Sequence, residues 1–96
     1  MATKSRNIEE LYRAFALLED KDEVKKFMID LCTPKELESF AERWQIARLL
    51  DKGELSYREI AKETGASTTT IGRVFRFLQQ ESYQGYRLIL DKMKNS

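Results

Sequence analysis

The stretch that decides the fold runs from Ser56 to Leu78 and reads SYREIAKETGASTTTIGRVFRFL. Ser56, followed three residues later by Glu59, forms a capping box, in which the hydroxyl and the carboxylate each accept a backbone N–H at a helix start. Gly65 can adopt the left-handed conformation that ends a helix, and Ser67 can cap the next one. The pattern therefore predicts two short helices joined by a tight turn, which is a helix-turn-helix.

The second of these helices has one apolar face. Its apolar residues follow the i, i+3, i+4, i+7 spacing of a buried helical stripe: Ile71, Val74, Phe75 and Leu78. Ala61 is a small residue four positions before Gly65, so the two helices can cross closely. Because Ile71 faces the same crossing, the spacing predicts that the pair packs as one unit.

The start of the second helix indicates what the pair does. Residues 67–70 are Ser-Thr-Thr-Thr, which are poor helix formers, whereas a surface selected only for stability would carry Ala, Glu or Lys. Short hydroxyl and methyl groups can approach base edges and phosphates in a major groove. Arg58, Arg73 and Arg76 are near enough to serve phosphates. The stretch favours DNA binding over the alternative, a helix pair that only docks on another protein.

Composition bounds the remaining possibilities. The 96 residues are 42% hydrophobic and 34% charged, with one Pro, four Gly and no β-type alternation, so we expect a single all-α domain over residues 1–96. No apolar run has the length of a membrane span and no signal peptide is evident, so we expect a cytoplasmic protein without membrane contact. The sole cysteine, Cys32, agrees with a reducing compartment. A net charge of only +1 predicts weak DNA affinity per protomer.

Six helices are predicted along the chain, after a flexible tail at residues 1–5. The strongest start signal is Thr33-Pro34-Lys35-Glu36, a capping box with Pro at the first helical position. It opens a long central helix whose expected inward residues are Leu37, Phe40, Ala41, Trp44, Ala47 and Leu49 or Leu50. The predicted ranges are about 7–19, 22–31, 33–52, the helix-turn-helix at 56–78, and 81–94.

Catalysis is not expected. The chain has no histidine, the commonest general base and metal ligand, and one cysteine cannot build a thiolate zinc site. The segment GASTTTIGR lacks the ending of a phosphate-binding loop and follows a helix instead of a strand. We therefore predict no catalytic residue, no metal and no cofactor.

Several motifs together resemble the bacterial Trp repressor superfamily, and most closely its TrpR-like YerC/YecD branch. They are Thr33-Pro34-Lys35-Glu36, Glu42-Arg43, the run from Leu50 to Glu59 and the run from Gly65 to Arg73. The resemblance implies a cytosolic transcriptional regulator, an intertwined all-helical homodimer whose helix-turn-helix reads an operator half-site in double-stranded DNA. The implied DNA contacts are Arg58, Ala61, Thr68, Thr69, Thr70 and Gly72, beside Ser67, Arg73 and Arg76 from the residue pattern.

The resemblance also implies a co-repressor pocket. In the family, tryptophan lies between two arginine side chains, which match Arg43 and Arg73 here, and Thr33 matches the residue that borders the pocket. Two positions depart from the family pattern: Val74 replaces a glycine and Phe77 replaces a small hydroxyl residue. Both departures put bulk where the ligand would lie, so we expect regulation without tryptophan.

Two alternatives stay open at this point. Arg43 and Arg73 are interpreted as interhelical ion-pair partners, with Glu42 or Glu36 as the acids, in preference to a retained tryptophan site. The protein is also compatible with a repressor that responds to a different small-molecule effector.

Overall fold

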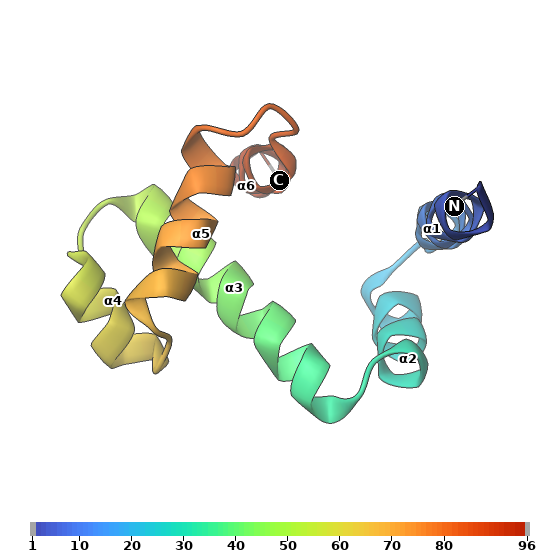
Figure 1. Ribbon diagram of the computed structural model, residues 1–96, viewed down its shortest axis with the longest axis horizontal. Coiled ribbons are helices and arrows are strands. Elements are labelled where there is room, and N and C mark those ends of the chain that lie inside the picture. Colours follow the sequence, from blue (N-terminus) through green and yellow to red (C-terminus); the bar gives the residue numbers. More distant parts are fainter. Residues whose placement is uncertain (1, 96) are drawn as a thin grey trace. The chain divides into compact units, whose positions relative to one another are not determined.

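The computed structural model describes residues 2–95, and in this range the chain forms six α-helices and no strand (Figure 1). The helices are α1 (Ala2–Ala16), α2 (Lys21–Leu31), α3 (Pro34–Lys52), α4 (Tyr57–Thr64), α5 (Thr68–Gln79) and α6 (Gly85–Lys94). The predicted all-α class and six-helix plan are confirmed. The chain divides into two compact units, residues 1–37 and 38–96, and the single domain stays a prediction. No helix in the described range is long and apolar enough to cross a membrane.

The first unit contains α1 and α2. The tail predicted at residues 1–5 is wrong for residues 2–5, which are the first turn of α1, and Met1 lies outside the described residues. The physical reason is that no Gly or Pro stops the helix from beginning earlier than residue 7, the predicted start. Asp20 caps α2 by accepting the Glu23 N–H at 2.9 Å. The rings of Phe15 and Phe27 meet edge to face, with centroids 5.2 Å apart.

The predicted capping box at the start of α3 is present. The Thr33 hydroxyl accepts the Glu36 N–H at 3.1 Å, and the Glu36 carboxylate accepts the Thr33 N–H at 2.9 Å. These two hydrogen bonds hold the pKa of Glu36 below its ordinary value. At the other end of α3, Gly53 adopts φ +70, the left-handed conformation that ends the helix where the sequence predicted.

The second unit has its core where α3, α4 and α5 meet. Six of its buried residues form one cluster: Ile46, Ala47, Ile60, Ala66, Ile71 and Val74. Of the residues expected to face inward on α3, Ala47 is buried and Trp44, Leu49 and Leu50 are half-buried against this cluster. Phe40 and Ala41 are exposed, which corrects the prediction. Ile46, which the sequence reading left out, is fully buried.

Helix α6 begins at Gly85, three or four residues later than predicted at Glu81-Ser82. Gln84 stands just before it in the left-handed conformation, at φ 58, and its side-chain amide donates to the Glu81 carbonyl. This local hydrogen bond gives residues 81–84 a turn in place of a first helical turn.

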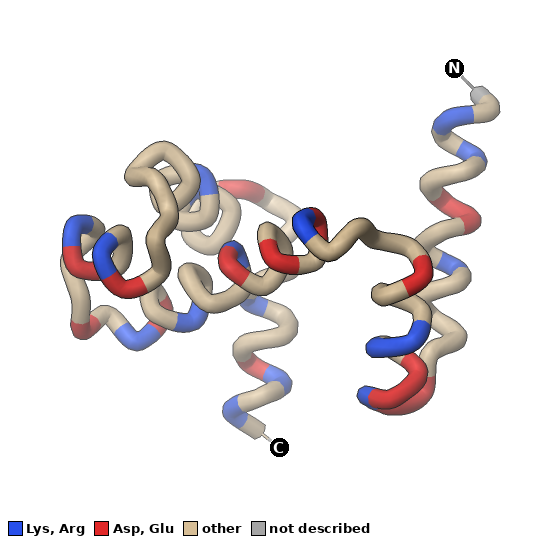
Figure 2. The backbone as a smooth tube through the Cα atoms, turned by 90° about the horizontal axis from the view of Figure 1, so that it is seen from below, with Lys and Arg blue, Asp and Glu red and all other residues tan. Residues whose placement is uncertain are grey.

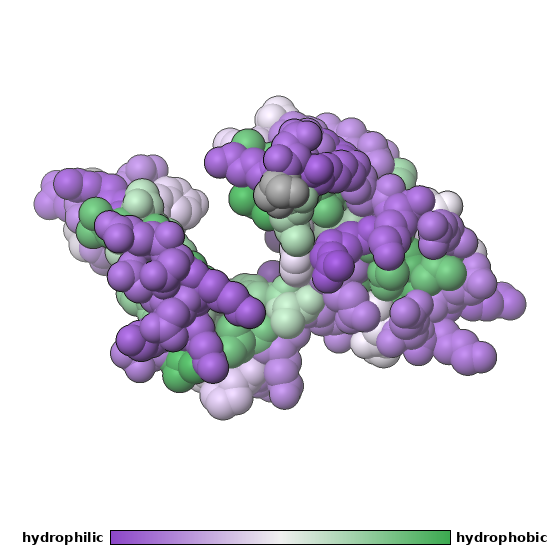
Figure 3. All heavy atoms as spheres, turned by 180° about the vertical axis from the view of Figure 1, so that it is seen from behind, coloured by the Kyte–Doolittle hydropathy of each residue, from purple (hydrophilic) through white to green (hydrophobic). Residues whose placement is uncertain are grey.

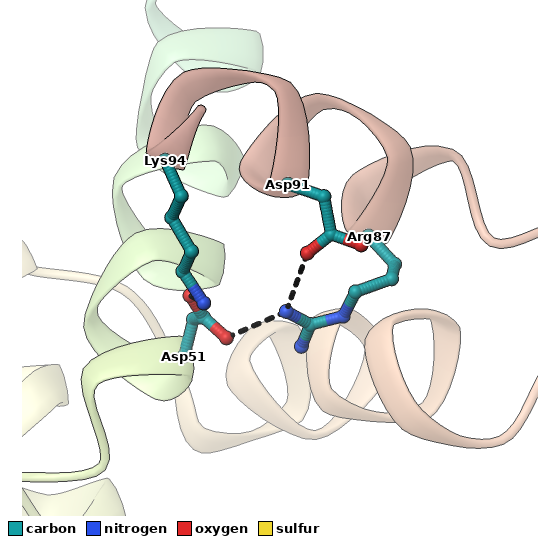
Figure 4. Close-up of polar contacts among 4 residues, drawn as sticks. All are labelled: Asp51, Arg87, Asp91 and Lys94. Atoms are coloured by element: carbon teal, nitrogen blue, oxygen red, sulfur yellow. Dashed lines mark hydrogen bonds and ion pairs between the residues drawn. The ribbon is translucent and has the colours of Figure 1, made fainter. Parts of the chain in front are cut away.

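Asp51 connects α6 to the end of α3 (Figure 4). Its side chain is 13% exposed and pairs with Arg87 Nη1 at 2.8 Å and with Lys94 Nζ at 3.1 Å. Arg87 also pairs with Asp91, at 3.5 Å. Hydrogen bonds from Arg87 and then Lys94 lower the pKa of Asp51. Tyr86 of α6 also stacks on Trp44 of α3, at 6.3 Å between ring centroids.

Candidate nucleic-acid interface

The geometry of the helix-turn-helix is fixed at its start and at its turn. The Ser56 hydroxyl accepts the Glu59 N–H at 3.2 Å, and the Glu59 carboxylate accepts the Ser56 N–H at 2.9 Å, which completes the predicted capping box. Gly65 adopts φ 77 and donates its N–H to the Ala61 carbonyl at 2.9 Å. Both signals were legible in the sequence because both involve neighbours in the chain.

Thr64 is a turn residue that the sequence reading missed. Its hydroxyl donates to the Ile60 carbonyl at 2.8 Å and accepts the Ala66 N–H at 3.1 Å, so one side chain spans the turn beside Gly65. Ile60 and Ala66 are themselves buried in the core of the second unit. The angle between α4 and α5 is therefore set by hydrogen bonds and by packing together. A threonine followed by glycine at a helix end was the available signal.

The beginning of α5 separates the hydroxyl residues into two groups. Ser67 caps the helix: its Oγ accepts the Thr70 N–H at 3.1 Å and lies 3.1 Å from the Thr70 hydroxyl. Thr70 is half-buried, while Thr68 and Thr69 are exposed and their hydroxyls have no partner among the described residues. Thr68 and Thr69 are thus the groups most available to an external partner.

The three predicted arginines are exposed, and they have different neighbours. Arg58 has no ion pair within the described part of the chain. The Arg73 guanidinium lies over the Phe77 ring at 4.4 Å from its centroid. Arg76 lies over the same ring at 5.0 Å and pairs with Glu81 at 3.3 Å.

The remaining predicted contact positions are more enclosed. Ala61 packs against the core and is half-buried. Gly72 is also half-buried, and a Cβ added there would meet nothing within 4 Å. Helix α5 carries Arg73 and Arg76 and no acidic residue, whereas α4 alternates both signs (Figure 2). The net positive charge of the helix pair therefore falls on α5, since the two cations of α4 are balanced by two acids.

A cavity of about 370 Å³ opens beside α5. It is lined by Arg43 of α3, by Arg73 and Phe77 of α5, and by residues 83–86. Val74 does not line it: its side chain is fully buried in the core, so the expected obstruction by Val74 is wrong. Successive residues point about 100° apart around a helix, and this turns Val74 inward when Arg73 faces the cavity. Thr33 belongs to the first compact unit, and its part in a pocket stays a prediction.

The interpretation of Arg43 and Arg73 as ion-pair partners is also wrong. Neither guanidinium has a carboxylate partner among residues 38–95; each lies over an aromatic ring, Arg43 over Phe40 at 5.6 Å and Arg73 over Phe77. The Glu36 carboxylate is engaged in its own capping box. An arginine stacked on a ring keeps the N–H groups at its edge available, so these cations are free to meet an external anion.

No cluster of three or more His, Cys, Asp or Glu side chains suited to a metal occurs in the described range.

The fold and the exposed start of α5 place the chain among the helix-turn-helix proteins.

Comparison with known proteins gives the family. The chain belongs to the Trp repressor family, because the sequence profile of the Trp repressor protein matches residues 6–94. The chain is 38% identical over 93 residues to the uncharacterized protein YerC of Bacillus subtilis strain 168, covering 97% of this chain and 88% of that protein.

Two crystal structures have the same fold. A TrpR-like protein from Eubacterium eligens ATCC 27750 superposes with a TM-score of 0.83 at 36% identity, covering 93% of this chain and 90% of that chain. A protein from Staphylococcus aureus gives a TM-score of 0.82 at 40% identity, covering 95% and 89%. The resemblance inferred from the motifs is thereby confirmed, and the fold is Trp-repressor-like.

Proposed function

We propose that this chain is a sequence-specific, DNA-binding transcriptional regulator that acts as a cytoplasmic homodimer and does not need tryptophan. The observation that carries the proposal is the pair of exposed residues Thr68 and Thr69 at the start of α5, whose hydroxyls have no partner within the described part of the chain. The caps and the turn that precede them hold this surface rigidly. A rigid helix start with short polar side chains suits the edges of bases in a major groove.

The remaining predicted DNA contacts fit this geometry as supporting groups. Arg58, Arg73 and Arg76 are exposed cations suited to backbone phosphates, which set register and carry no sequence information. Ala61 and Gly72 are small, so a DNA backbone could approach the helix pair closely at these positions. Ser67 positions the helix start through its cap.

A homodimer is favoured by the apolar surface that the chain leaves open (Figure 3). Large apolar residues that are at least 40% exposed occur on or beside α1, α2 and α6: Ile8, Tyr12, Leu17, Val24, Ile29, Leu31, Tyr83, Leu88, Ile89 and Met93. A chain of 96 residues has little core of its own to cover them. Two copies would also place two reading helices about 34 Å apart, one turn of DNA.

Independence from tryptophan rests on Phe77 alone, since Val74 lies in the core. The Phe77 ring lines the cavity and already occupies one face of the Arg73 guanidinium. A ligand ring would have to displace that contact before it could lie against Arg73. Phe77 also offers no hydroxyl to the ammonium group of an amino acid.

The direct test is binding-site selection from random duplexes, followed by fluorescence anisotropy on the selected site and on a scrambled duplex. We expect a selected palindromic consensus and preferential binding at low salt, unchanged by millimolar tryptophan. Isothermal titration calorimetry with tryptophan checks the second point independently. A failure to enrich any sequence would contradict sequence-specific recognition, and saturable tryptophan binding that tightens the DNA complex would contradict independence from it.

A second candidate is a regulator that responds to another small molecule. The observation in its favour is the cavity of about 370 Å³, lined by two guanidinium groups that have no carboxylate partner among residues 38–95. Ligand clefts typically measure about 300–1,000 Å³. A thermal-shift screen of small organic anions tests this candidate, because a ligand that binds only the native state raises the melting temperature with its concentration. Arg43→Gln is the variant in which such a shift should disappear.

A further inference from the structure

The ring of Phe77 in α5 contacts two arginine side chains of the same helix. The guanidinium of Arg73, one helical turn earlier, lies 4.4 Å from the ring centroid, and that of Arg76 lies 5.0 Å from it. Phe77 is half-buried, so its position is constrained by the protein, whereas both arginines are exposed. A long arginine side chain on a surface ordinarily samples many rotamers, and contact with a fixed ring restricts that freedom.

The surroundings of these cations point to an external anion. Neither Arg73 nor Arg43, which lines the same cavity, has a carboxylate partner among residues 38–95. Arg76 pairs with Glu81, but both side chains are largely open to solvent, 55% and 41% exposed. Such an exposed ion pair is weak, so Arg76 can readily exchange Glu81 for another anion. Stacking also leaves the N–H edge of each guanidinium free to donate in its plane, the geometry that a phosphate accepts.

We propose that Phe77 is a positioning residue for the DNA backbone: its ring holds Arg73 and Arg76 so that their N–H edges donate to phosphate oxygens. This inference rests on the proposed DNA-binding function and names a residue that acts through others. Arg76 then exchanges Glu81 for a phosphate on binding. The role concerns backbone affinity and not base recognition, because phosphate contacts are the same for every sequence.

The test compares Phe77→Leu, which keeps apolar bulk and removes the ring, with Phe77→Trp, which keeps an aromatic face. Phe77→Leu should weaken binding by about three- to tenfold, the equivalent of one or two exposed cation–π contacts. The loss should be equal on the selected site and on the scrambled duplex. The slope of log affinity against log salt should fall by up to about 0.9 per lost phosphate contact. Phe77→Trp should keep both the affinity and the salt slope of the wild type.

Phe75→Leu is the matched control. Phe75 is a half-buried ring on the same helix, but its ring meets Tyr57, with centroids 5.9 Å apart, and no arginine of the described residues lies over it. This variant should keep the wild-type salt slope, and melting temperatures of all variants identify any general loss of folding. An Arg73→Gln/Phe77→Leu double variant should lose less than the sum of the two single losses.

Two results would overturn the inference. Wild-type affinity and slope in Phe77→Leu would show that the ring does not position the arginines, as would strictly additive losses in the double variant. If the wild-type protein itself binds neither duplex, the proposed function and this inference fail together. Normal binding by the wild type with an unaffected Phe77→Leu refutes the positioning role alone.

Discussion

At the scale of single residues, side chains that look alike in the sequence have different surroundings in the structure. Thr68, Thr69 and Thr70 are consecutive, yet only Thr70 lies against the Ser67 cap and is half-buried. Arg58, Arg73 and Arg76 differ in the same way, since one is unpaired in the described chain, one lies on a ring and one has both a ring and an acid.

Thr68→Ala and Thr69→Ala should each change the preferred base pairs more than Thr70→Ala does. A lost base contact costs about 1–3 kcal/mol, while the hydroxyl of Thr70 is already engaged with Ser67. Binding-site selection with each variant measures the change, and Ser39→Ala on the exposed surface of α3 is the control. If the Thr68/Thr69 double variant selects the wild-type consensus, these residues do not read bases.

Glu81→Gln should strengthen DNA binding. The substitution removes the acid that competes for Arg76, and an exposed ion pair of this kind corresponds to about a two- to fivefold change in affinity. Anisotropy titrations at several salt concentrations measure the effect. Glu63→Gln makes the same change in charge on α4 at an exposed residue without an ion pair in the described chain. If Glu63→Gln increases the affinity equally, or if Glu81→Gln still increases it in an Arg76→Ala background, the effect comes from net charge and not from the Arg76–Glu81 pair.

At the scale of helices, α6 is held by long-range contacts. Asp51 at the end of α3 pairs with both Arg87 and Lys94, and Tyr86 stacks on Trp44. Residues 84–86 line the cavity beside α5, so these contacts also place one of its walls. The position of α6 is consequently sensitive to one carboxylate.

Asp51→Asn should lower the melting temperature at neutral pH and flatten its dependence on pH in acid. The ion pairs hold the folded-state pKa of Asp51 below the unfolded value, so their stabilisation is present above about pH 4 and is lost as pH falls through the folded pKa. Thermal unfolding of both proteins from pH 7 to pH 2 tests this. Asp30→Asn, an exposed residue without an ion pair in the described chain, should keep the wild-type profile. Parallel acid profiles in Asp51→Asn would rule out this role.

At the scale of the whole molecule, the open apolar residues on α1, α2 and α6 predict an obligate homodimer. Sedimentation equilibrium at micromolar concentration should give twice the chain mass of 11.3 kDa. Ile89→Lys on α6 should promote dissociation or unfolding, because Ile89 is apolar and 44% exposed, whereas Ser82→Lys on the adjacent turn should not. A folded wild-type monomer at that concentration would refute the prediction.

The sequence by itself determined what depends on neighbours along the chain. The capping boxes at Thr33 and Ser56, the cap at Ser67 and the left-handed Gly65 all involve residues within four positions of one another. The predicted apolar stripe of α5 is set by helical periodicity: Ile71, Val74 and Leu78 are buried as expected, and Phe75 is half-buried. These local signals were sufficient to predict the all-α class, the helix-turn-helix and the family.

Only the tertiary structure decided which side chains meet across helices. It left Phe40 exposed and paired Asp51 with Arg87, 36 positions away. A stripe of apolar residues predicts that a helix has a buried side. How much of that side is buried, and which side chains it contacts, depend on where the other helices pack. That docking is the sum of many weak contacts between residues distant in sequence, and no single position records it.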